Sequence, residues 1–274
     1  MIWKKLPGVI ILAIICGIIL SVVYINPYDG QTSVSSLILQ LSGARANFQL
    51  GISLNELLAF CTRMVPGFLL ELYLGTNMYR HFCTASVYVF SRTGNRFKWY
   101  LQECLIIVAF VAAFQMIMPV TAIGITSLRY KVSLDSNGLL LLGIHYVIYV
   151  LWVFAMTLLL NILSLSLGCD IAVVLTIGGQ CAFITLLSLL RLLEGNPVLY
   201  SLALKANPVS HLVVGWHTIA IKAISNCVLS TYAEISFLST FYYMSIVVFS
   251  ITIAGCIFVC TRDLIVSDAE FGTI

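Results

Sequence analysis

The stretch GVIILAIICGIILSVVYI, residues 8–25, contains no charged side chain. A helix of this length rises about 1.5 Å per residue and covers roughly 27 Å, close to the thickness of the hydrocarbon core of a bilayer. Hydrophobic residues make up 61% of the 274 residues. A soluble domain is usually about half apolar, because it cannot bury more. The sequence therefore predicts an integral membrane protein.

Five further apolar runs have a similar length. With the first run, the predicted spans are 8–25, 57–79, 104–125, 139–163, 171–190 and 238–260. Polar, turn-forming stretches separate them, and no long polar segment is left for a second domain. Lys4 and Lys5 before the first run also suit a signal peptide, but no small-x-small cleavage site follows. Residues 1–274 are therefore predicted to form one all-α transmembrane domain with six spans.

Lysine and arginine residues in the loops predict the orientation, because cytoplasmic loops carry an excess of them. With the N-terminus inside, the inner segments hold Lys4, Lys5, Arg80, Arg92, Arg96, Lys98 and Arg262, and the outer segments hold Arg45, Arg129, Lys131, Lys205 and Lys222. Between Glu71 and Glu103 the chain has four cations and no acid. We therefore expect a multi-pass protein of the cell membrane with both termini in the cytoplasm.

The stretch SRTGNRFKWY, residues 91–100, gathers three cations in a chain with only 9% charged residues. Thr93 and Gly94 are typical of a turn, and Asn95 is a good N-cap for a helix that begins at Arg96. Residues 78–90 before it suit a short helix along the inner membrane surface. We expect a basic cytoplasmic elbow between the second and third spans. The alternative is a topology signal that only contacts anionic lipid.

Residues 211–225 have the clearest amphipathic pattern in the chain. At 100° per residue, Leu212 and Trp216 share an apolar face with Ile219, whereas His211 and Lys222 lie on the opposite face. The segment is too short to span, so we expect an interfacial or re-entrant helix on the outer side, between the fifth and sixth spans. His211 and His217 would lie about 120° apart on such a helix, so no metal site is expected there.

Two ionisable residues, Arg63 and Glu71, lie within the second span. Such groups are costly in lipid and mark functional sites by default. On a helix they would be about 12 Å apart, too far for a direct ion pair. We expect Arg63 and Glu71 to line a transport pathway. A structural hydrogen bond from Glu71 to a neighbouring helix is the alternative.

Motifs of several enzyme classes are missing from the sequence. It has no GxxxxGK[ST] loop, no HExxH and no GxSxG, so no catalytic residue and no metal site is predicted. One enzymatic alternative is a cysteine peptidase that uses His81 and Cys83 in the elbow. The nine cysteines include no CxxC pair and suit buried apolar positions better than a disulfide framework. A net charge of +3 is too small to indicate nucleic-acid binding.

The layout resembles the permease subunits of bacterial type-2 ABC exporters. The resemblance rests on Tyr79-Arg80, on the elbow at 91–99 and on the segment 207–225. It implies that the elbow, through Arg92, Thr93, Gly94 and Arg96, docks onto a separate cytoplasmic ABC ATPase. It further implies that ATP and Mg bind to that partner, with no cofactor on this chain, and that two permease chains, expected to be a homodimer, enclose the path in the lipid membrane.

A substrate such as an antimicrobial peptide or a drug would fit the small external part of the chain. Two other classes of function compete with this one. The first is the membrane-embedded cysteine peptidase, and the second is an immunity protein that protects its cell from a peptide. Neither needs a partner ATPase, so association with one separates the three hypotheses.

Overall fold

The computed structural model describes residues 5–27, 30–42, 54–81, 96–193, 196–218 and 235–261. Within them, six helices are long and apolar enough to cross a membrane: Leu6–Tyr24 (α1), Leu58–His81 (most of α3, Leu54–Leu74, and the turns after it), Arg96–Arg129 (α5), Ser136–Leu167 (α6), Cys169–Leu189 (α7) and Phe237–Thr261 (α10). The predicted helical class is confirmed, and the number of helices long and apolar enough to span a membrane matches the prediction.

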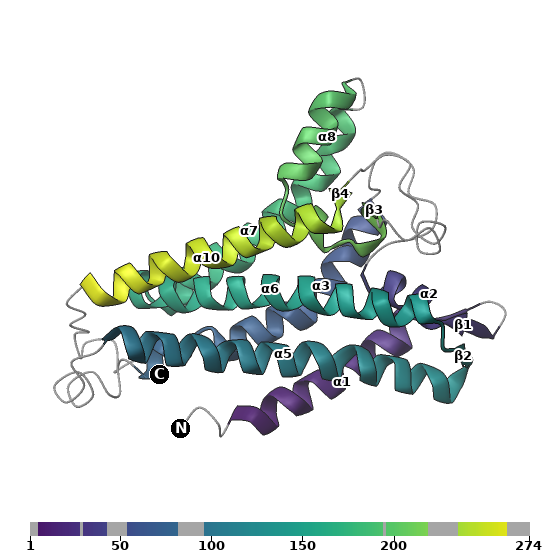
Figure 1. The fold of residues 1–274 in the computed structure, drawn as a ribbon, viewed down its shortest axis with the longest axis horizontal. Helices are drawn as coiled ribbons and strands as arrows, with labels where there is room; N and C mark the ends of the chain where they lie inside the picture. Colours follow the sequence, from purple (N-terminus) through teal and green to yellow (C-terminus); the bar gives the residue numbers. More distant parts are fainter. Residues whose placement is uncertain are drawn as a thin grey trace.

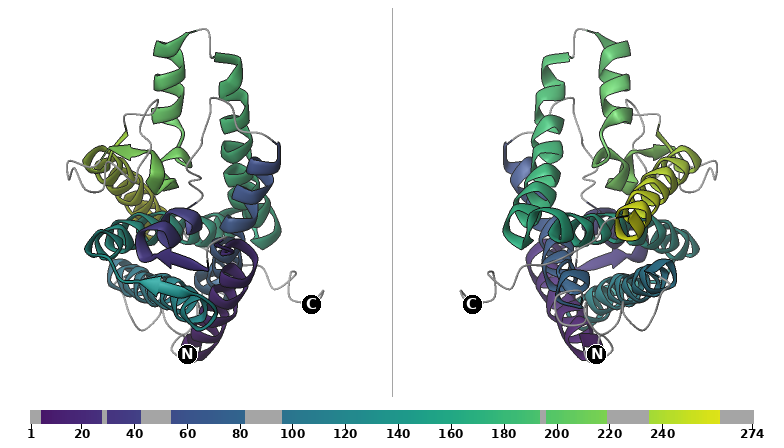
Figure 2. Two further views of the ribbon diagram at one scale, coloured as in Figure 1. Left: turned by 90° about the vertical axis from the view of Figure 1, so that its right-hand side faces the viewer. Right: turned by 90° about the vertical axis from the view of Figure 1, so that its left-hand side faces the viewer.

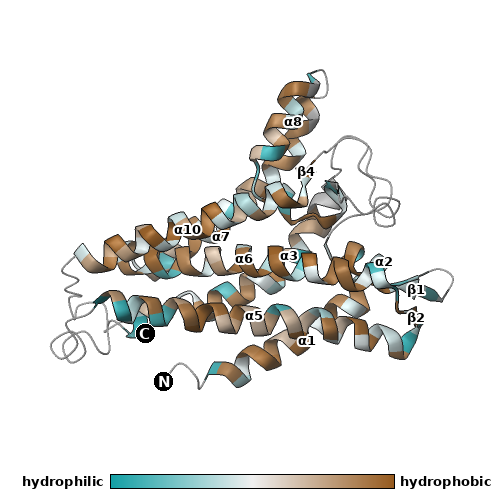
Figure 3. Cartoon of the chain, viewed as in Figure 1, coloured by the Kyte–Doolittle hydropathy of each residue, from teal (hydrophilic) through white to brown (hydrophobic). Residues whose placement is uncertain are grey.

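The spans alternate in direction along the bundle (Figure 1). The start of α1 at Leu6 and the end of α10 at Thr261 therefore lie at the same end, which we call the proximal end. The opposite end, where α1 stops at Tyr24 and α10 starts at Phe237, is the distal end. Hydropathy varies along the bundle: apolar residues dominate along the helices, and polar residues gather near the helix ends (Figure 3).

The central helix is α6, which packs against α2, α3, α5, α7 and α10. Its Leu141, Ile148 and Leu158 are fully buried. The outer helices α1, α7 and α10 instead expose large apolar side chains such as Val23 and Phe249. An apolar exterior of this extent suits lipid better than water.

Short polar elements connect the helices at the distal end. β1 (Gln31–Ser33) pairs in parallel with β2 (Lys131–Ser133), with Thr32 opposite Val132. α2 (Val34–Leu41) follows β1, and the side chain of Ser33 caps it by accepting a hydrogen bond from the Ser36 amide. The Asp135 carboxylate accepts from the Ser35 amide at 3.2 Å. This contact fixes the start of α2 beside the start of α6.

A helical hairpin that the sequence did not predict follows the fifth span. α7 continues as a 3₁₀ turn, η2 (Leu190–Leu193), and α8 (Pro197–Ala206) runs back. The hairpin stands away from the rest of the bundle (Figure 2). The Asn196 side chain caps α8 by accepting from the Leu199 amide at 3.2 Å, and Pro197 occupies the first turn.

The prediction of one amphipathic helix over 211–225 is wrong for its described part. This part forms η3 (Ser210–Leu212), η4 (Val214–Trp216) and β3 (His217–Thr218), which pairs in parallel with β4 (Ile235–Ser236). His211, Trp216 and His217 are buried instead of lying at an interface. Polar side chains cause the difference, because Ser210 and the two histidines bond to backbone carbonyls and so compete with a helix.

Other predicted features lie outside the described residues. These are Lys222 of the expected outer helix and Arg92, Thr93 and Gly94 of the elbow. Arg96 lies in the first turn of α5. The polar residues from Arg96 to Glu103 therefore belong to the same continuous helix as the third span.

Candidate functional site

A small pocket with polar groups in its walls lies between four of the spans, with room for about one water molecule. Helices α3, α5, α6 and α7 supply its walls, which consist of Arg63, Met64, Pro66, Gly67, Phe68, Glu71, Gln115, Met118, Tyr149, Trp152, Val153 and Gln180. Polar side chains come from all four helices. Because each is costly to place in lipid, their meeting at one site inside the bundle identifies the strongest candidate for a functional centre.

Three of these residues form a hydrogen-bonded chain across three helices. The Gln180 side-chain amide on α7 donates to Glu71 Oε2 on α3 at 2.6 Å. The Trp152 indole N–H on α6 donates to Gln180 Oε1 at 3.1 Å. Glu71, Trp152 and Gln180 are all buried. The indole N–H is a donor only, so it fixes the orientation of the Gln180 amide and directs the NH₂ group at the carboxyl of Glu71.

Gln115 on α5 adds an unsatisfied oxygen to the same pocket. The side chain is 1% exposed, and its Oε1 has no hydrogen-bond partner among the described residues. A buried polar atom without a partner costs about 1–3 kcal/mol. A ligand or a water molecule that donates a hydrogen bond in the pocket would remove this cost. The site is therefore built to receive a donor group.

Arg63 forms the wall of the pocket two helical turns from Glu71, on the distal side. Its guanidinium lies over the ring of Tyr24 on α1, 4.8 Å from the ring centroid. The Tyr24 hydroxyl is in turn hydrogen-bonded to Thr62. These contacts attach the distal part of α3 to α1. Both residues predicted to line a pathway, Arg63 and Glu71, thus belong to one cavity wall.

The second span is interrupted at the proximal end. α3 ends at Leu74, residues 75–76 form a turn, and 77–81 are helical again. Asn161 of α6 bridges the break, because its amide donates to the Leu74 carbonyl at 3.1 Å and its Oδ1 accepts from the Met78 amide at 2.9 Å. One side chain therefore satisfies a backbone acceptor and a backbone donor that the interrupted helix leaves open.

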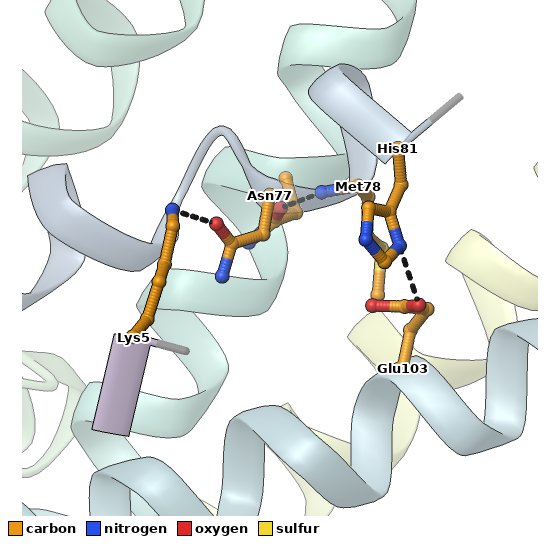
Figure 4. A network of polar contacts seen from close by, with 6 residues as sticks. Lys5, Asn77, Met78, His81 and Glu103 are labelled. Atoms are coloured by element: carbon orange, nitrogen blue, oxygen red, sulfur yellow. Dashed lines mark hydrogen bonds and ion pairs between the residues drawn. The ribbon is translucent and has the colours of Figure 1, made fainter. Parts of the chain in front are cut away.

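Further polar contacts lie around this break (Figure 4). The Lys5 ammonium, just before α1, donates to the Asn77 side chain and to the Tyr73 carbonyl. Burial, with a smaller contribution from nearby Arg80, lowers the pKa of Lys5. On the other side, His81 Nδ1 lies 3.0 Å from Glu103 Oε1 of α5. The residues that lead into the elbow are thus attached to α1, α5 and α6.

Sequence reasoning missed four residues of these sites: Trp152, Gln115, Gln180 and Asn161. The last three are amides within otherwise apolar spans, and that pattern alone could have marked them. Among the described residues, no group of three or more His, Cys, Asp or Glu side chains could hold a metal ion.

Comparisons with known proteins do not add to this picture. No family model, no curated protein sequence and no solved structure matches the chain.

Proposed function

We propose that this chain is the permease subunit of a type-2 ABC exporter. In this proposal the six helices cross the cell membrane with both termini in the cytoplasm, and two copies pair around the transport path. A separate cytoplasmic ATPase binds ATP and Mg and drives export of a substrate such as an antimicrobial peptide or a drug. The observation that carries the proposal is the polar pocket around Glu71, placed inside a bundle of apolar spans.

The pocket supports transport because its polar groups are held in place without closing the cavity. Gln180 and Trp152 orient the Glu71 carboxyl, while Gln115 keeps an acceptor oxygen without a partner among the described residues. The pocket has room for one small group, so a single amine or amide N–H of a peptide or drug would find acceptors there, beside apolar residues such as Met118 and Val153. The chemistry favours a substrate that is both apolar and a hydrogen-bond donor.

The proximal end supports coupling to a cytoplasmic partner. Arg80 follows the break in the second span, and Arg96 and Lys98 begin α5. Asn161 connects the break directly to the central helix α6. A partner that moves the elbow would therefore act on the helix that also carries Trp152 of the pocket.

Co-expression with the ABC ATPases of the same organism tests the proposal. The wild-type membrane protein should retain the ATPase on an affinity resin and stimulate its ATP hydrolysis. Arg92→Ala with Arg96→Ala should lose both effects, because arginines at an interface form bidentate bonds with carboxylates. Lys131→Ala with Lys205→Ala removes two cations at the distal end and should change neither. Undiminished retention by the first double variant would contradict docking through the elbow.

A second candidate, a membrane-embedded cysteine peptidase, is favoured by one contact. The Glu103 carboxylate lies 3.0 Å from His81 Nδ1, and a catalytic histidine is commonly oriented by such an acid. The proposed nucleophile, Cys83, lies outside the described residues. Cys83→Ser would abolish processing of a peptide precursor by a peptidase, whereas an exporter with this substitution should still stimulate its ATPase.

A further inference from the structure

Two histidines that are distant from the pocket meet at one hydroxyl group. His211 of η3 and His217 of β3 both approach Thr240 on α10. His211 Nδ1 and His217 Nε2 each lie 2.8 Å from Thr240 Oγ1. All three side chains are buried, with exposed fractions of 2% or less. The Thr240 oxygen thus links the distal cap, by which we mean residues 197–218, to the sixth span.

The second nitrogen of each ring faces a backbone carbonyl. His211 Nε2 lies 2.9 Å from the Lys205 oxygen, and His217 Nδ1 lies 3.1 Å from the Val213 oxygen. A carbonyl oxygen can only accept, so both of these nitrogens carry hydrogen. In a neutral imidazole the other nitrogen is then an acceptor. Both nitrogens that face Thr240 therefore need a donor when the rings are neutral.

Thr240 cannot supply two donors, because a hydroxyl has one hydrogen. With both rings neutral, one contact is O–H···N and the other brings two lone pairs together at 2.8 Å. One additional proton resolves this. If His217 is an imidazolium, its Nε2–H donates to Thr240 Oγ1, and the Thr240 hydroxyl donates to His211 Nδ1. A second proton would leave the hydroxyl without either acceptor and place two positive charges around one oxygen.

We propose that His211, Thr240 and His217 form a binding site for one proton, which is shared between the two imidazoles through the Thr240 hydroxyl. The transfer is balanced. His217 Nε2 gives its proton to Thr240 Oγ1 while Oγ1 gives its own proton to His211 Nδ1, and the reverse step restores the first state. The number of protons in the cluster stays constant, and each state has all four hydrogen bonds.

The surroundings contain an aromatic ring that suits a cation. The Tyr243 ring stacks on His211 with centroids 4.6 Å apart and an angle of 13°, an arrangement that favours the charged form. Of the elements packed around the cluster, α6 and α10 contain no Asp, Glu, Lys or Arg. α8 contributes Lys205, whose carbonyl accepts from His211. The titratable ring on α6, His145, stacks instead on Tyr149 at 4.1 Å.

Burial sets the pH range in which the proton is taken up. It lowers the pKa of His211, and it lowers the pKa of His217 to about 4, where the nearby His211 adds to the effect. The hydrogen bonds to backbone carbonyls act in the opposite direction on both rings. Both values lie below the ordinary histidine pKa of about 6.5, so we expect an empty site at pH 8 and uptake of the proton as the pH approaches about 4.

Nitrogen NMR of the full chain in phospholipid nanodiscs, labelled with ¹⁵N-histidine, tests this directly. The chain contains only four histidines, so each ring can be assigned by single substitution. Between pH 8 and about pH 4, the His211 and His217 signals should shift together, with a summed change that approaches one proton and does not exceed it. Two neutral rings at about pH 4, two full protons, or a change in one ring alone would each overturn the proposal.

Substitutions at Thr240 provide matched variants. Thr240→Ser keeps the hydroxyl and should retain the shared one-proton step. Thr240→Val has nearly the same shape but no hydroxyl, and its proton uptake between pH 8 and about pH 4 should fall well below that of the wild type. If Thr240→Val still takes up one proton over the same range, the hydroxyl is not the bridge and the proposal fails.

Discussion

Asn161 gives the sharpest test of the packing around the second span. Its amide donates to the carbonyls of Leu74 and Thr157 and accepts from the Met78 amide, at 2.8–3.1 Å. Asn161→Leu keeps a side chain of similar size but orphans the Leu74 oxygen and the Met78 N–H at the break. Buried backbone groups without partners cost about 1–3 kcal/mol each, whereas hydrogen bonds inside membrane proteins average about 0.6 kcal/mol. We expect Asn161→Leu to lower the free energy of unfolding by about 2 kcal/mol, between the values that these two scales give.

The measurement is the free energy of unfolding in mixed micelles, obtained by titration with a denaturing detergent. A loss of about 2 kcal/mol corresponds to roughly a 30-fold change in the unfolding equilibrium. Ser166→Ala on the same helix is the matched control. Its hydroxyl is exposed and bonds only to the Leu163 carbonyl of its own helix, so the change should stay within about 0.5 kcal/mol. Equal stability of Asn161→Leu and wild type would refute the role assigned to Asn161.

Three further predictions follow from the same structure. Gly75→Ala should destabilise the fold by at least about 1 kcal/mol in the same titration, because the added Cβ would lie 2.4 Å from the Glu71 carbonyl oxygen. Gly179→Ala, whose added Cβ meets nothing within 4 Å, should be neutral. A larger loss of stability in Gly179→Ala than in Gly75→Ala would count against the packing at the break. Gln180→Leu should reduce substrate export more than Thr185→Val on the same helix. The first variant removes the donor to Glu71, whereas the Thr185 hydroxyl bonds only within its own helix. Equal export by the two variants would exclude a role of the Glu71–Gln180 hydrogen bond in transport. Burial lowers the pKa of His217 to about 4, so between that pH and about 6.5 the unfolded state holds a proton that the folded state does not. The free energy of unfolding should therefore fall on acidification by about 1.4 kcal/mol per pH unit for this group. His217→Gln should reduce the pH dependence measured by thermal unfolding at about pH 7.5 and about pH 5, and the remaining part belongs to His211, whose pKa burial also lowers.

The spans could be predicted from sequence because each is a long apolar run whose signal does not depend on its neighbours. The pocket could be predicted only in part. Glu71 and Arg63 stand out by charge, but Gln180, which donates to Glu71, comes from another span 109 positions away. The amide of Gln180 marks one face of α7, but no local pattern encodes that this face meets α3.

The structure of the distal cap was predicted wrongly for a different reason. The periodicity of residues 211–218 fits a helix, but His211, His217 and Ser210 find stronger local and tertiary hydrogen bonds than a helix would give them. Their partner Thr240 lies on α10, more than twenty positions later. A hydrophobic pattern assigns apolar residues to the buried face and polar residues to the exposed face. It cannot detect a polar side chain that is buried because it forms a hydrogen bond with a distant part of the chain.

The separation of Glu71 from Gln180 also has a consequence for biogenesis. Ribosomes add about 5–20 residues per second, so the 109 residues between them take roughly 5–20 s to synthesise. During this interval the Glu71 carboxyl is delivered toward the bilayer without its eventual donor. The second span should therefore be a poor autonomous substrate for the translocon and should linger at its lateral exit until α7 emerges. Membrane quality control would then meet this intermediate on every chain that is made, and any variant that delays α7 would lengthen the exposure.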